Sequence, residues 1–370
     1  MVRLYEYESK KIFKENGIKI PNGQLINDLK NAENIKFPVM LKAQVLTGGR
    51  GKIGGVVKIE NDTSLRENYE RIKNSKFKGY EVKSILLEET IEINEEFFLS
   101  ITIDNYVEKP LLIFSKRGGV DIEELFENNP EEILKIYLEY APPLNLDQLR
   151  SKLMYLKFPE LILNELLEII NNCYQVMFKI DANLVEINPL GLTSKGLIAL
   201  DAHIGIDHNS IFRQSQFEHR IREELKPDEY EAESRGMAYV DLENPRGVGV
   251  ICNGAGLVMG TMDAINDIGG VPANFLDIGG GADQERIYHA LKIISKKPFI
   301  SVIFINIFGG ITRCDEIAKG IIRFLNETKA NIIIRMIGTN FEDGQKILLN
   351  HKITSFESLP EALNHLKKFL

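Results

Sequence analysis

Residues 42–52 read KAQVLTGGRGK, and this basic, glycine-rich stretch decides how the first half of the chain is interpreted. Lys42 ends an apolar β run, and Gly49, Arg50 and Gly51 lie in the loop that follows. Glycine lets a backbone approach an anion closely, and the cations supply positive charge. No helix follows the loop, so it is not a P-loop. We interpret it as a phosphate-binding hairpin loop; a flexible basic hairpin tip is the alternative.

Two further glycine-rich stretches lie in the last third of the chain. Residues 253–256 read NGAG and residues 306–315 read NIFGGITRCD. Each follows an apolar β run and precedes a helical pattern, where backbone N–H groups and the helix dipole can hold an anion. A nicotinamide fingerprint competes at residues 254–260, with Asp277 about 20 residues on. Its spacing, G-x-G-x-x-x-G, weakens that interpretation.

The composition limits the class of protein. A chain of 370 residues exceeds one ordinary core, so we expect two domains. Hydrophobic content of 44% and charged content of 26% are typical of soluble globular proteins, and a net charge of −8 argues against nucleic-acid binding. The three cysteines lack metal-site spacing. No run approaches the roughly 18 apolar residues of a membrane span. We expect a cytoplasmic protein that binds no membrane.

The first half mixes antiparallel strands with helices. We expect helices at residues 6–16, 130–140, 146–155 and 159–180, and strands at residues 39–45, 54–59, 84–88, 96–103, 109–115, 182–187 and 196–202.

The pattern changes after a charge-rich stretch at residues 214–243. We interpret that stretch as a solvated connector, with an exposed helix as the alternative, and divide the chain into residues 1–236 and 237–370. Beyond it, β and α patterns alternate, and continuous β-branched runs indicate a parallel sheet covered by helices. Five strands fit a small doubly wound, flavodoxin-like domain. They are expected at residues 248–252, 273–277, 299–307, 331–337 and 352–356.

Oxygen-bearing side chains accompany the first-half strands. Glu88 and Glu96 lie at the ends of two β runs, where a carboxylate could bind ribose hydroxyls or be merely solvated. If the strands on either side of residues 193–195 form a hairpin with an even-length turn, Asn188 and Asp201 share a face, with Glu186 beside them. Such converging oxygens suit Mg²⁺.

Together these residues resemble the β subunit of succinyl-CoA synthetase (succinate–CoA ligase, ADP-forming). The resemblance covers nearly the whole chain, and its strings occupy residues 4–7, 42–55, 118–123, 186–190, 200–202, 253–263, 272–282 and 306–315. It implies an ATP-grasp nucleotide-binding region at residues 1–236 and a flavodoxin-like CoA-ligase domain at residues 237–370. The implied reaction couples the interconversion of succinyl-CoA with succinate and CoA to ATP and ADP, in the tricarboxylic acid cycle. Phosphate passes through a phosphohistidine on an α subunit.

The resemblance also implies roles for individual residues. Positions that bind the nucleotide are matched by Lys42, Gly49, Arg50, Gly51, Glu88, Ile91 and Glu96. Positions that hold Mg²⁺ are matched by Asn188 and Asp201. Positions that contact the carboxylate substrate are matched by Asn253, Gly310, Ile311 and Thr312. Glu186 matches the glutamate that assists the phosphohistidine. Family members often have lysine where His203 stands, and Ile91 occupies a nucleotide-contact position that varies.

None of the six histidines lies in a glycine-rich strand-to-helix loop, so the chain has candidate phosphate sites but no carrier histidine. We therefore expect an α-subunit partner, in a heterodimer or heterotetramer, with CoA bound mainly on that partner. Three alternatives remain: a sibling ligase for malate or citrate, a nicotinamide dehydrogenase, and a non-catalytic scaffold. A non-catalytic scaffold would be expected to lack the metal ligands, whereas Asn188 and Asp201 are present in this sequence.

Overall fold

The computed structural model describes residues 1–120, 122–140, 143–244 and 246–370; Asp121, in one of the motif strings, lies outside them. The chain forms two compact units, Met1–Glu224 and Leu225–Leu370. The expected boundary, between residues 236 and 237, falls after helix α7 (Pro227–Glu233), which packs on the second unit against β14 (Ala238–Asp241). No helix among the described residues is long and apolar enough to cross a membrane.

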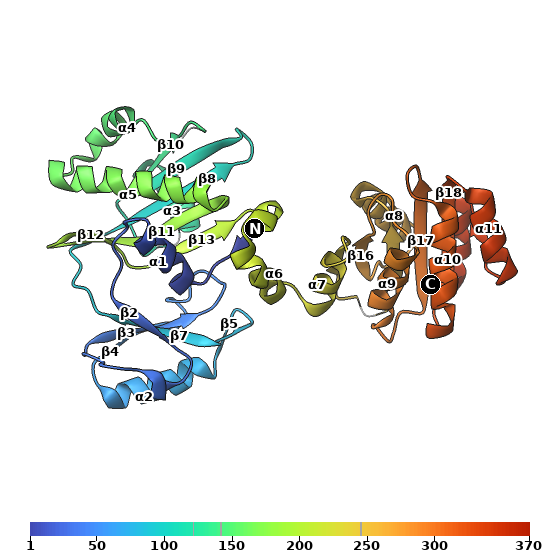
Figure 1. Ribbon diagram of the computed structural model, residues 1–370, viewed down its shortest axis with the longest axis horizontal. Helices are drawn as coiled ribbons and strands as arrows, with labels where there is room; N and C mark the ends of the chain where they lie inside the picture. The colour runs from blue at the N-terminus through green and yellow to red at the C-terminus, as the bar shows by residue number, and fades with distance from the viewer. Residues whose placement is uncertain (121, 141–142, 245) are drawn as a thin grey trace. The chain divides into compact units, whose positions relative to one another are not determined.

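A seven-stranded sheet forms most of the first unit, with the order β1-β13-β11-β8-β9-β10 and with β12 paired to β11. The long helix α5 (Glu160–Lys179) lies along this sheet (Figure 1), and its apolar face joins the core. The strands are β1 (Val2–Arg3), β8 (Glu95–Asp104), β9 (Lys109–Ser115), β10 (Ile133–Tyr137), β11 (Ala182–Thr193), β12 (Gly196–Ala199) and β13 (His203–Ile206). Further helices of this unit are α1 (Glu6–Glu15), α3 (Ile122–Asn128), α4 (Leu146–Leu153) and α6 (Glu218–Glu224).

A second, four-stranded antiparallel sheet has the order β2-β7-β3-β4 and is covered by helix α2 (Asp62–Lys73) (Figure 1). The glycine-rich loop joins two neighbouring strands of this sheet, as the hairpin prediction required. A small hairpin, β5 (Lys76–Phe77) with β6 (Tyr80–Glu81), follows α2. The sheet strands are β2 (Gly23–Ile26), β3 (Val39–Gln44), β4 (Val56–Ile59) and β7 (Ser84–Glu89).

Two predictions that involve the first unit need correction. The helix expected at residues 130–140 is wrong: a short 3-10 turn at Pro130–Glu132 leads into strand β10, which pairs antiparallel with β9. β9 offers an open edge there, and pairing with it outweighs a local helical pattern. The stretch at residues 214–243, expected to be a solvated connector, does contain the division between the two units, after Glu224, but much of it folds into α6, α7 and β14.

The second unit has one six-stranded sheet in the order β14-β16-β15-β17-β18-β19. The last five strands of the chain pair in parallel, and their spatial order is that of a flavodoxin-like fold, which confirms the prediction. β14 adds an antiparallel edge beyond β16. The strands are β15 (Gly249–Cys252), β16 (Asn274–Asp277), β17 (Val302–Gly309), β18 (Asn331–Gly338) and β19 (Ser355–Phe356).

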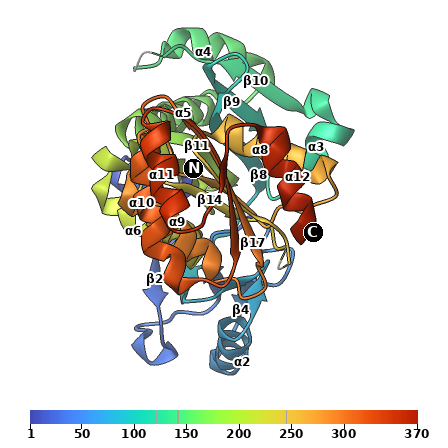
Figure 2. The ribbon, with the colours of Figure 1, turned by 90° about the vertical axis from the view of Figure 1, so that its right-hand side faces the viewer.

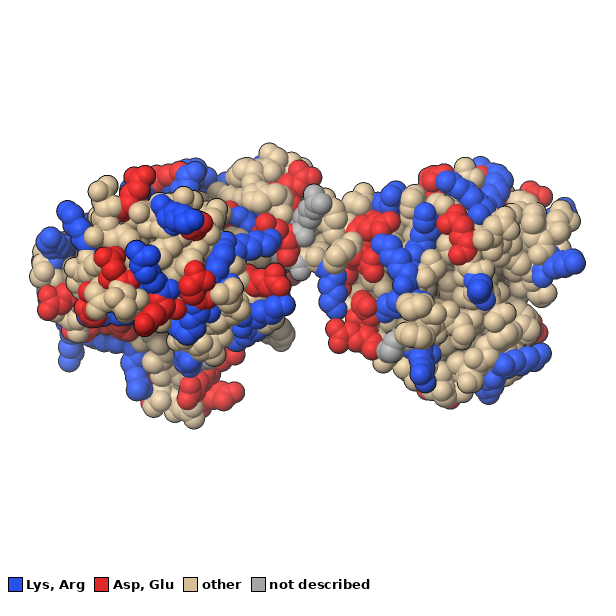
Figure 3. All heavy atoms as spheres, turned by 90° about the horizontal axis from the view of Figure 1, so that it is seen from below, with Lys and Arg blue, Asp and Glu red and all other residues tan. Residues whose placement is uncertain are grey.

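Helices cover both faces of this sheet. Figure 2 shows α9 (Gln284–Ser295), α10 (Cys314–Phe324) and α11 (Phe341–Asn350) on one side, with α8 (Ala255–Asp267) and α12 (Leu359–Leu366) on the other. Each side has its own apolar core, because the central strands bury side chains in both directions. On the face of each unit seen in Figure 3, acidic and basic side chains are interspersed.

Candidate functional site

Six charged side chains meet in the first unit, beside the glycine-rich loop. We call them the buried ion cluster: Glu6, Lys10, Lys42, Arg50, Glu88 and Asp201. All but Asp201 are more than nine-tenths buried. They come from α1, β3, the loop, β7 and the segment after β12, so the fold assembles the cluster from distant parts of the sequence.

Lys42 is held from three directions. Its Nζ lies 3.0 Å from Glu6 Oε1 and 2.7 Å from Glu88 Oε2, and it donates a hydrogen bond of 2.6 Å to the carbonyl oxygen of Leu200. An ammonium group has three N–H donors, so these contacts fix its position. Lys10 lies beside it, with its Nζ 2.8 Å from Glu6 Oε1 and 2.6 Å from Glu88 Oε1.

Arg50 connects the cluster to the glycine-rich loop. Its guanidinium bonds Glu6 Oε2, lies 3.0 Å from Asp201 Oδ1 and donates a 2.8 Å bond to the carbonyl oxygen of Ala43. Around it, a Cβ added to Gly48 or Gly51 would meet no heavy atom of the described residues within 4 Å, apart from its neighbours in the chain. The loop therefore presents an open backbone surface above a fixed set of charges.

Burial alone would raise the pKa of the Glu6 carboxyl, but the three cations of the cluster outweigh it and hold that pKa well below its ordinary value. Burial lowers the pKa of Lys42, yet the surrounding carboxylates overcome this effect and raise it. For Lys10, burial dominates and its pKa is lowered. Lys42 thus carries its positive charge at neutral pH.

The remaining residues expected at the nucleotide lie outside the cluster. Gly49 and Gly51 are exposed in the loop, and Ile91 is half-buried in the segment after β7. Glu96 is exposed on β8, and its carboxylate lies against Gly119, where an added Cβ would come within 2.5 Å of Oε2.

Of the expected metal pair, Asn188 lies on β11 and Asp201 lies in the segment just after β12, the strand that forms a hairpin with β11. The hairpin turn has two residues between the paired Thr193 and Gly196, which meets the even-length condition of the prediction. Asn188 Oδ1 accepts a 2.8 Å hydrogen bond from the N–H of Gly119. Asp201 Oδ1 accepts one of the same length from the N–H of Ala202, and its side chain is 36% exposed.

Glu186 lies on β11, opposite His203 of β13 and Ser100 of β8. Burial, and then the negative charge of Asp201, raises the pKa of Glu186 to about 7. Burial lowers the pKa of His203. No hydrogen bond or ion pair holds the Glu186 carboxyl within the described residues. A carboxyl group in this state can exchange a proton near neutral pH.

The second-unit residues come together where β15 and β17 diverge. Asn253, directly after β15, donates through Nδ2 to the carbonyl oxygen of Phe308 at 2.9 Å and to Thr312 Oγ1 at 3.1 Å. Thr312 Oγ1 in turn accepts from the N–H of Gly281 at 3.0 Å. In sheets of this order, ligands bind at the carboxyl edge where the strand order reverses.

This edge is open for an anion. In the described part of the chain, a Cβ added to Gly254, Gly256 or Gly310 would meet no heavy atom within 4 Å beyond its chain neighbours and its own helix backbone, and no side chain caps the N-terminus of α8. Ile311 is exposed, whereas Thr312 is fully buried.

Asp277 has a structural role at the same edge. Its Oδ1 accepts hydrogen bonds from the N–H groups of Gly254, at 2.6 Å, and Gly279, at 2.8 Å. A nicotinamide site needs this carboxylate for a ribose. Here it fixes two loops instead, which removes the main support for the dehydrogenase alternative.

Comparisons with known protein families and with curated relatives both cover most of the chain. The ATP-grasp domain family matches residues 3–192, and the CoA-ligase family matches residues 251–369. The succinate–CoA ligase (ADP-forming) subunit beta of Methanocaldococcus jannaschii is 43% identical over 367 residues, which cover 98% of each chain. That of Desulfurococcus amylolyticus is 41% identical over 370 residues, covering 98% of this chain and 97% of the relative.

The chain belongs to the succinate–CoA ligase β-subunit family. Among solved structures, ATP citrate lyase of Methanothrix soehngenii, in complex with citrate and coenzyme A, matches with a TM-score of 0.70 and 20% identity. The match covers 98% of this chain and 99% of that one. At this identity the similarity concerns the fold, and it confirms the predicted ATP-grasp and flavodoxin-like arrangement.

Sequence reasoning missed two members of the buried ion cluster, Glu6 and Lys10. Both lie on α1, one helical turn apart, and they form an i,i+4 ion pair. The spacing is visible in the sequence, but such pairs usually lie on a solvated face. The helix instead turns this pair inward.

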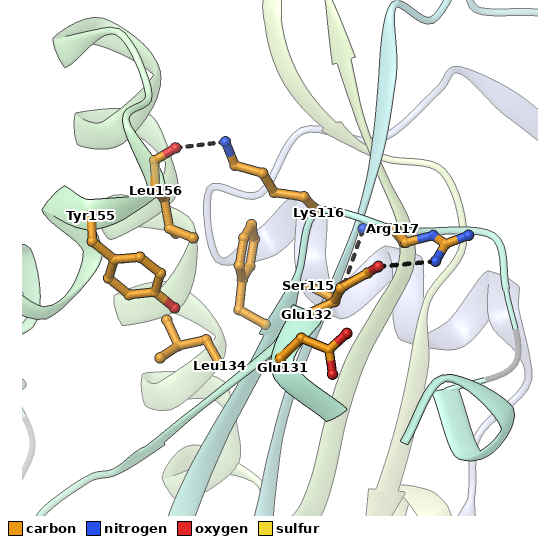
Figure 4. Close-up of a pocket in the computed structure, with 9 residues that line it drawn as sticks. Ser115, Lys116, Arg117, Glu131, Glu132, Leu134, Tyr155 and Leu156 are labelled. Atoms are coloured by element: carbon orange, nitrogen blue, oxygen red, sulfur yellow. Dashed lines mark hydrogen bonds and ion pairs between the residues drawn. The ribbon is translucent and has the colours of Figure 1, made fainter. Parts of the chain in front are cut away.

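A cavity of about 260 Å³ in the first unit lies apart from all predicted residues. Figure 4 shows its lining: the Lys116 ammonium donates a 2.5 Å bond to the carbonyl oxygen of Leu156, and Arg117 bonds Glu132. Its cations are therefore engaged by the protein itself, and its lining is mostly apolar.

Proposed function

We propose that this chain is the nucleotide-binding β subunit of a succinate–CoA ligase. It would couple the interconversion of succinyl-CoA with succinate and CoA to ATP and ADP, through a phosphohistidine on an α subunit. The observation that carries the proposal is the buried ion cluster, which holds Lys42 and Arg50 immobile beside an open glycine-rich loop.

Phosphoryl transfer depends on positioning and on neutralising charge more than on side-chain chemistry. The carboxylates of Glu6 and Glu88 fix the cations before any nucleotide arrives. Charges fixed in advance need no reorganisation during the reaction, which is the source of electrostatic catalysis. Gly49 and Gly51 would supply backbone N–H groups to the phosphates. Ile91 and Glu96 would contribute contacts to the rest of the nucleotide.

Asn188 and Asp201 would hold Mg²⁺. Both offer oxygen donors, the type this ion prefers, and Mg²⁺ commonly takes one or two protein oxygens together with phosphates and water. No group of three or more His, Cys, Asp or Glu side chains is placed to hold a metal ion in the described ranges. A bound Mg²⁺ would neutralise negative charge on the nucleotide phosphates.

The second unit would receive the carboxylate substrate. Asn253, Gly310, Ile311 and Thr312 surround the open N-terminus of α8, where N–H groups favour an anion. Glu186, in the first unit, would assist the phosphohistidine as a proton-exchanging group.

The carrier histidine would come from the partner. The six histidines of this chain lie on strand β13, in the turn after it, on α6, α9 and α12, and just after α11. None belongs to a glycine-rich loop at either proposed site. CoA would bind mainly on the α subunit.

Co-expression with an α subunit tests the proposal. The purified complex should form an acyl-CoA from ATP, CoA and succinate, with malate and citrate as competing substrates in the same panel. Preference for malate or citrate would assign the chain to a sibling ligase, and failure with all three would contradict the proposal.

A further inference from the structure

The hairpin β5–β6 contacts the glycine-rich loop, although it is not part of the sheet whose strands β3 and β4 the loop joins. Phe77 pairs with Tyr80, and the turn between them consists of Lys78 and Gly79. Both turn residues have positive φ, 49° and 88°, as a tight two-residue hairpin turn requires. The backbone therefore fixes the point from which the Lys78 side chain extends.

Two contacts fasten this region to the loop. Phe77 is buried, and a Cβ added to Gly55 would lie 3.2 Å from its ring, so the ring packs against the end of the loop. Arg71, on the preceding helix α2, donates a 3.1 Å hydrogen bond to the carbonyl oxygen of Gly54. The hairpin and the loop thus form one packed structure.

The ammonium of Lys78 lies over the exposed backbone of Gly49. Its Nζ would be 3.8 Å from a Cβ added there, and no other heavy atom of the described residues, apart from the neighbours of Gly49 in the chain, comes within 4 Å of that position. Within the described residues, Lys78 makes no hydrogen bond or ion pair. Its charge lies next to Gly49, and the nearby Gly48 and Gly51 carry no side chain that would block access to the loop backbone.

The other cations near the loop have partners. Lys42 and Arg50 belong to the buried ion cluster. Lys58 pairs with Glu60 at 2.8 Å, and Lys52 lies 3.9 Å from a carboxylate oxygen of Glu124. Lys78 differs from all four, because no hydrogen bond or ion pair to another described residue accounts for its position near the loop.

We propose that Lys78 is a further nucleotide-binding residue, which contacts the terminal phosphates of a nucleoside di- or triphosphate lying on the glycine-rich loop. The inference rests on the proposed nucleotide-binding function of this unit. A lysine ammonium is a compact point charge that suits phosphate oxygens. Lys78 would therefore contact the phosphates and make no contact with the base or the ribose.

The test compares Lys78→Asn with Lys76→Asn in the complex with the α subunit. Asparagine tolerates the left-handed backbone of the turn, so the first variant removes the charge and keeps the hairpin. Lys76 lies on the same hairpin but pairs with Glu81 at 3.0 Å. Calorimetry would give the dissociation constants of ATP, ADP and AMP at low and high salt.

Lys78→Asn should weaken ATP and ADP binding about three- to tenfold and leave AMP nearly unchanged, with a shallower salt dependence for ATP. Lys78→Arg should retain most of the affinity, and Lys76→Asn should match the wild type. Equal ATP affinity of the wild type and Lys78→Asn would overturn this role alone. An equal loss for AMP would also overturn it. Absence of ATP binding by the wild-type complex would overturn the proposed function as well.

Discussion

The Lys10 ammonium bonds both carboxylate oxygens of Glu88, at 2.6 and 2.7 Å, although 78 residues separate the two in sequence. Both side chains are almost fully buried. Burying charges costs free energy unless they are paired closely, so the first helix and strand β7 depend on each other through this contact. The same geometry sets the position of Lys42, which shares Glu88.

Glu6→Gln should destabilise the first unit by about 3–5 kcal/mol at neutral pH, because it leaves buried cations without their carboxylate. The wild type should also lose stability on acidification. The folded-state pKa of Glu6 is held well below its ordinary value, so its contribution is complete above the unfolded pKa of about 4.3 and is lost as pH falls towards the folded pKa.

Urea unfolding from about pH 7 to about pH 3, followed by hydrogen exchange in peptides from the first unit, measures this effect. The wild type should show a steeper loss than Glu6→Gln in the acidic window. Glu60→Gln, at an exposed surface pair, serves as the control and should behave as the wild type. Identical acid profiles for Glu6→Gln and the wild type would refute a stabilising role for the carboxylate.

Asp201→Asn, or Asn188→Ala, should abolish phosphorylation of the partner histidine while the fold stays intact. The expected loss in the phosphorylation rate is at least about 100-fold. This is comparable to the rate loss when an enzyme loses one group that stabilises the charge developing in its transition state. Labelled phosphate from ATP, counted on the α subunit, gives the result. Asn183→Ala, on the same strand β11, is the control. Full phosphohistidine formation by a folded variant at ordinary Mg²⁺ concentration would eliminate the metal assignment.

The sequence contains clear information about the second unit, because its strands are buried on both faces and read as continuous apolar runs. The run ending at Cys252 is an example. Strand β10 was mispredicted, since its partner edge on β9 is a tertiary feature that no local pattern records.

The candidate site was only partly visible in the sequence. Lys42 and Arg50 stood in a recognisable motif, but their carboxylate partner Glu6 is distant in sequence. Its ordinary helical spacing to Lys10 is the pattern of a solvated pair. Lys78 shows the same limit, because only the packing of Phe77 on the loop brings that lysine near Gly49.

Gly256→Val should impair succinyl-CoA formation and leave ATP binding unchanged. Apart from its chain neighbours and the backbone of its own helix, a Cβ at this position meets no heavy atom of the described residues within 4 Å, so the fold can accept it, but it would intrude on the open N-terminus of α8. That terminus favours an anion by roughly 0.3–1 kcal/mol when exposed and up to about 2 when partly buried.

Calorimetry of ATP and turnover measured on the same variant separate the two sites. Gly260→Val, further along α8 and equally unhindered, controls for the cost of valine in a helix. Parallel loss of ATP affinity and turnover would mean that the two anion sites are not separate. Normal turnover would mean that the helix start is only structural.

The most direct measurement is transfer of the labelled γ-phosphate of ATP to a histidine of the α subunit, followed by succinyl-CoA formation. The complex of this chain with the α subunit should perform both steps. This chain alone should perform neither, because none of its own histidines lies in a glycine-rich strand-to-helix loop that could carry the phosphate. CoA ligation by the chain without a partner would contradict its assignment as half of an enzyme, and an unlabelled α subunit in an active complex would contradict the phosphohistidine route.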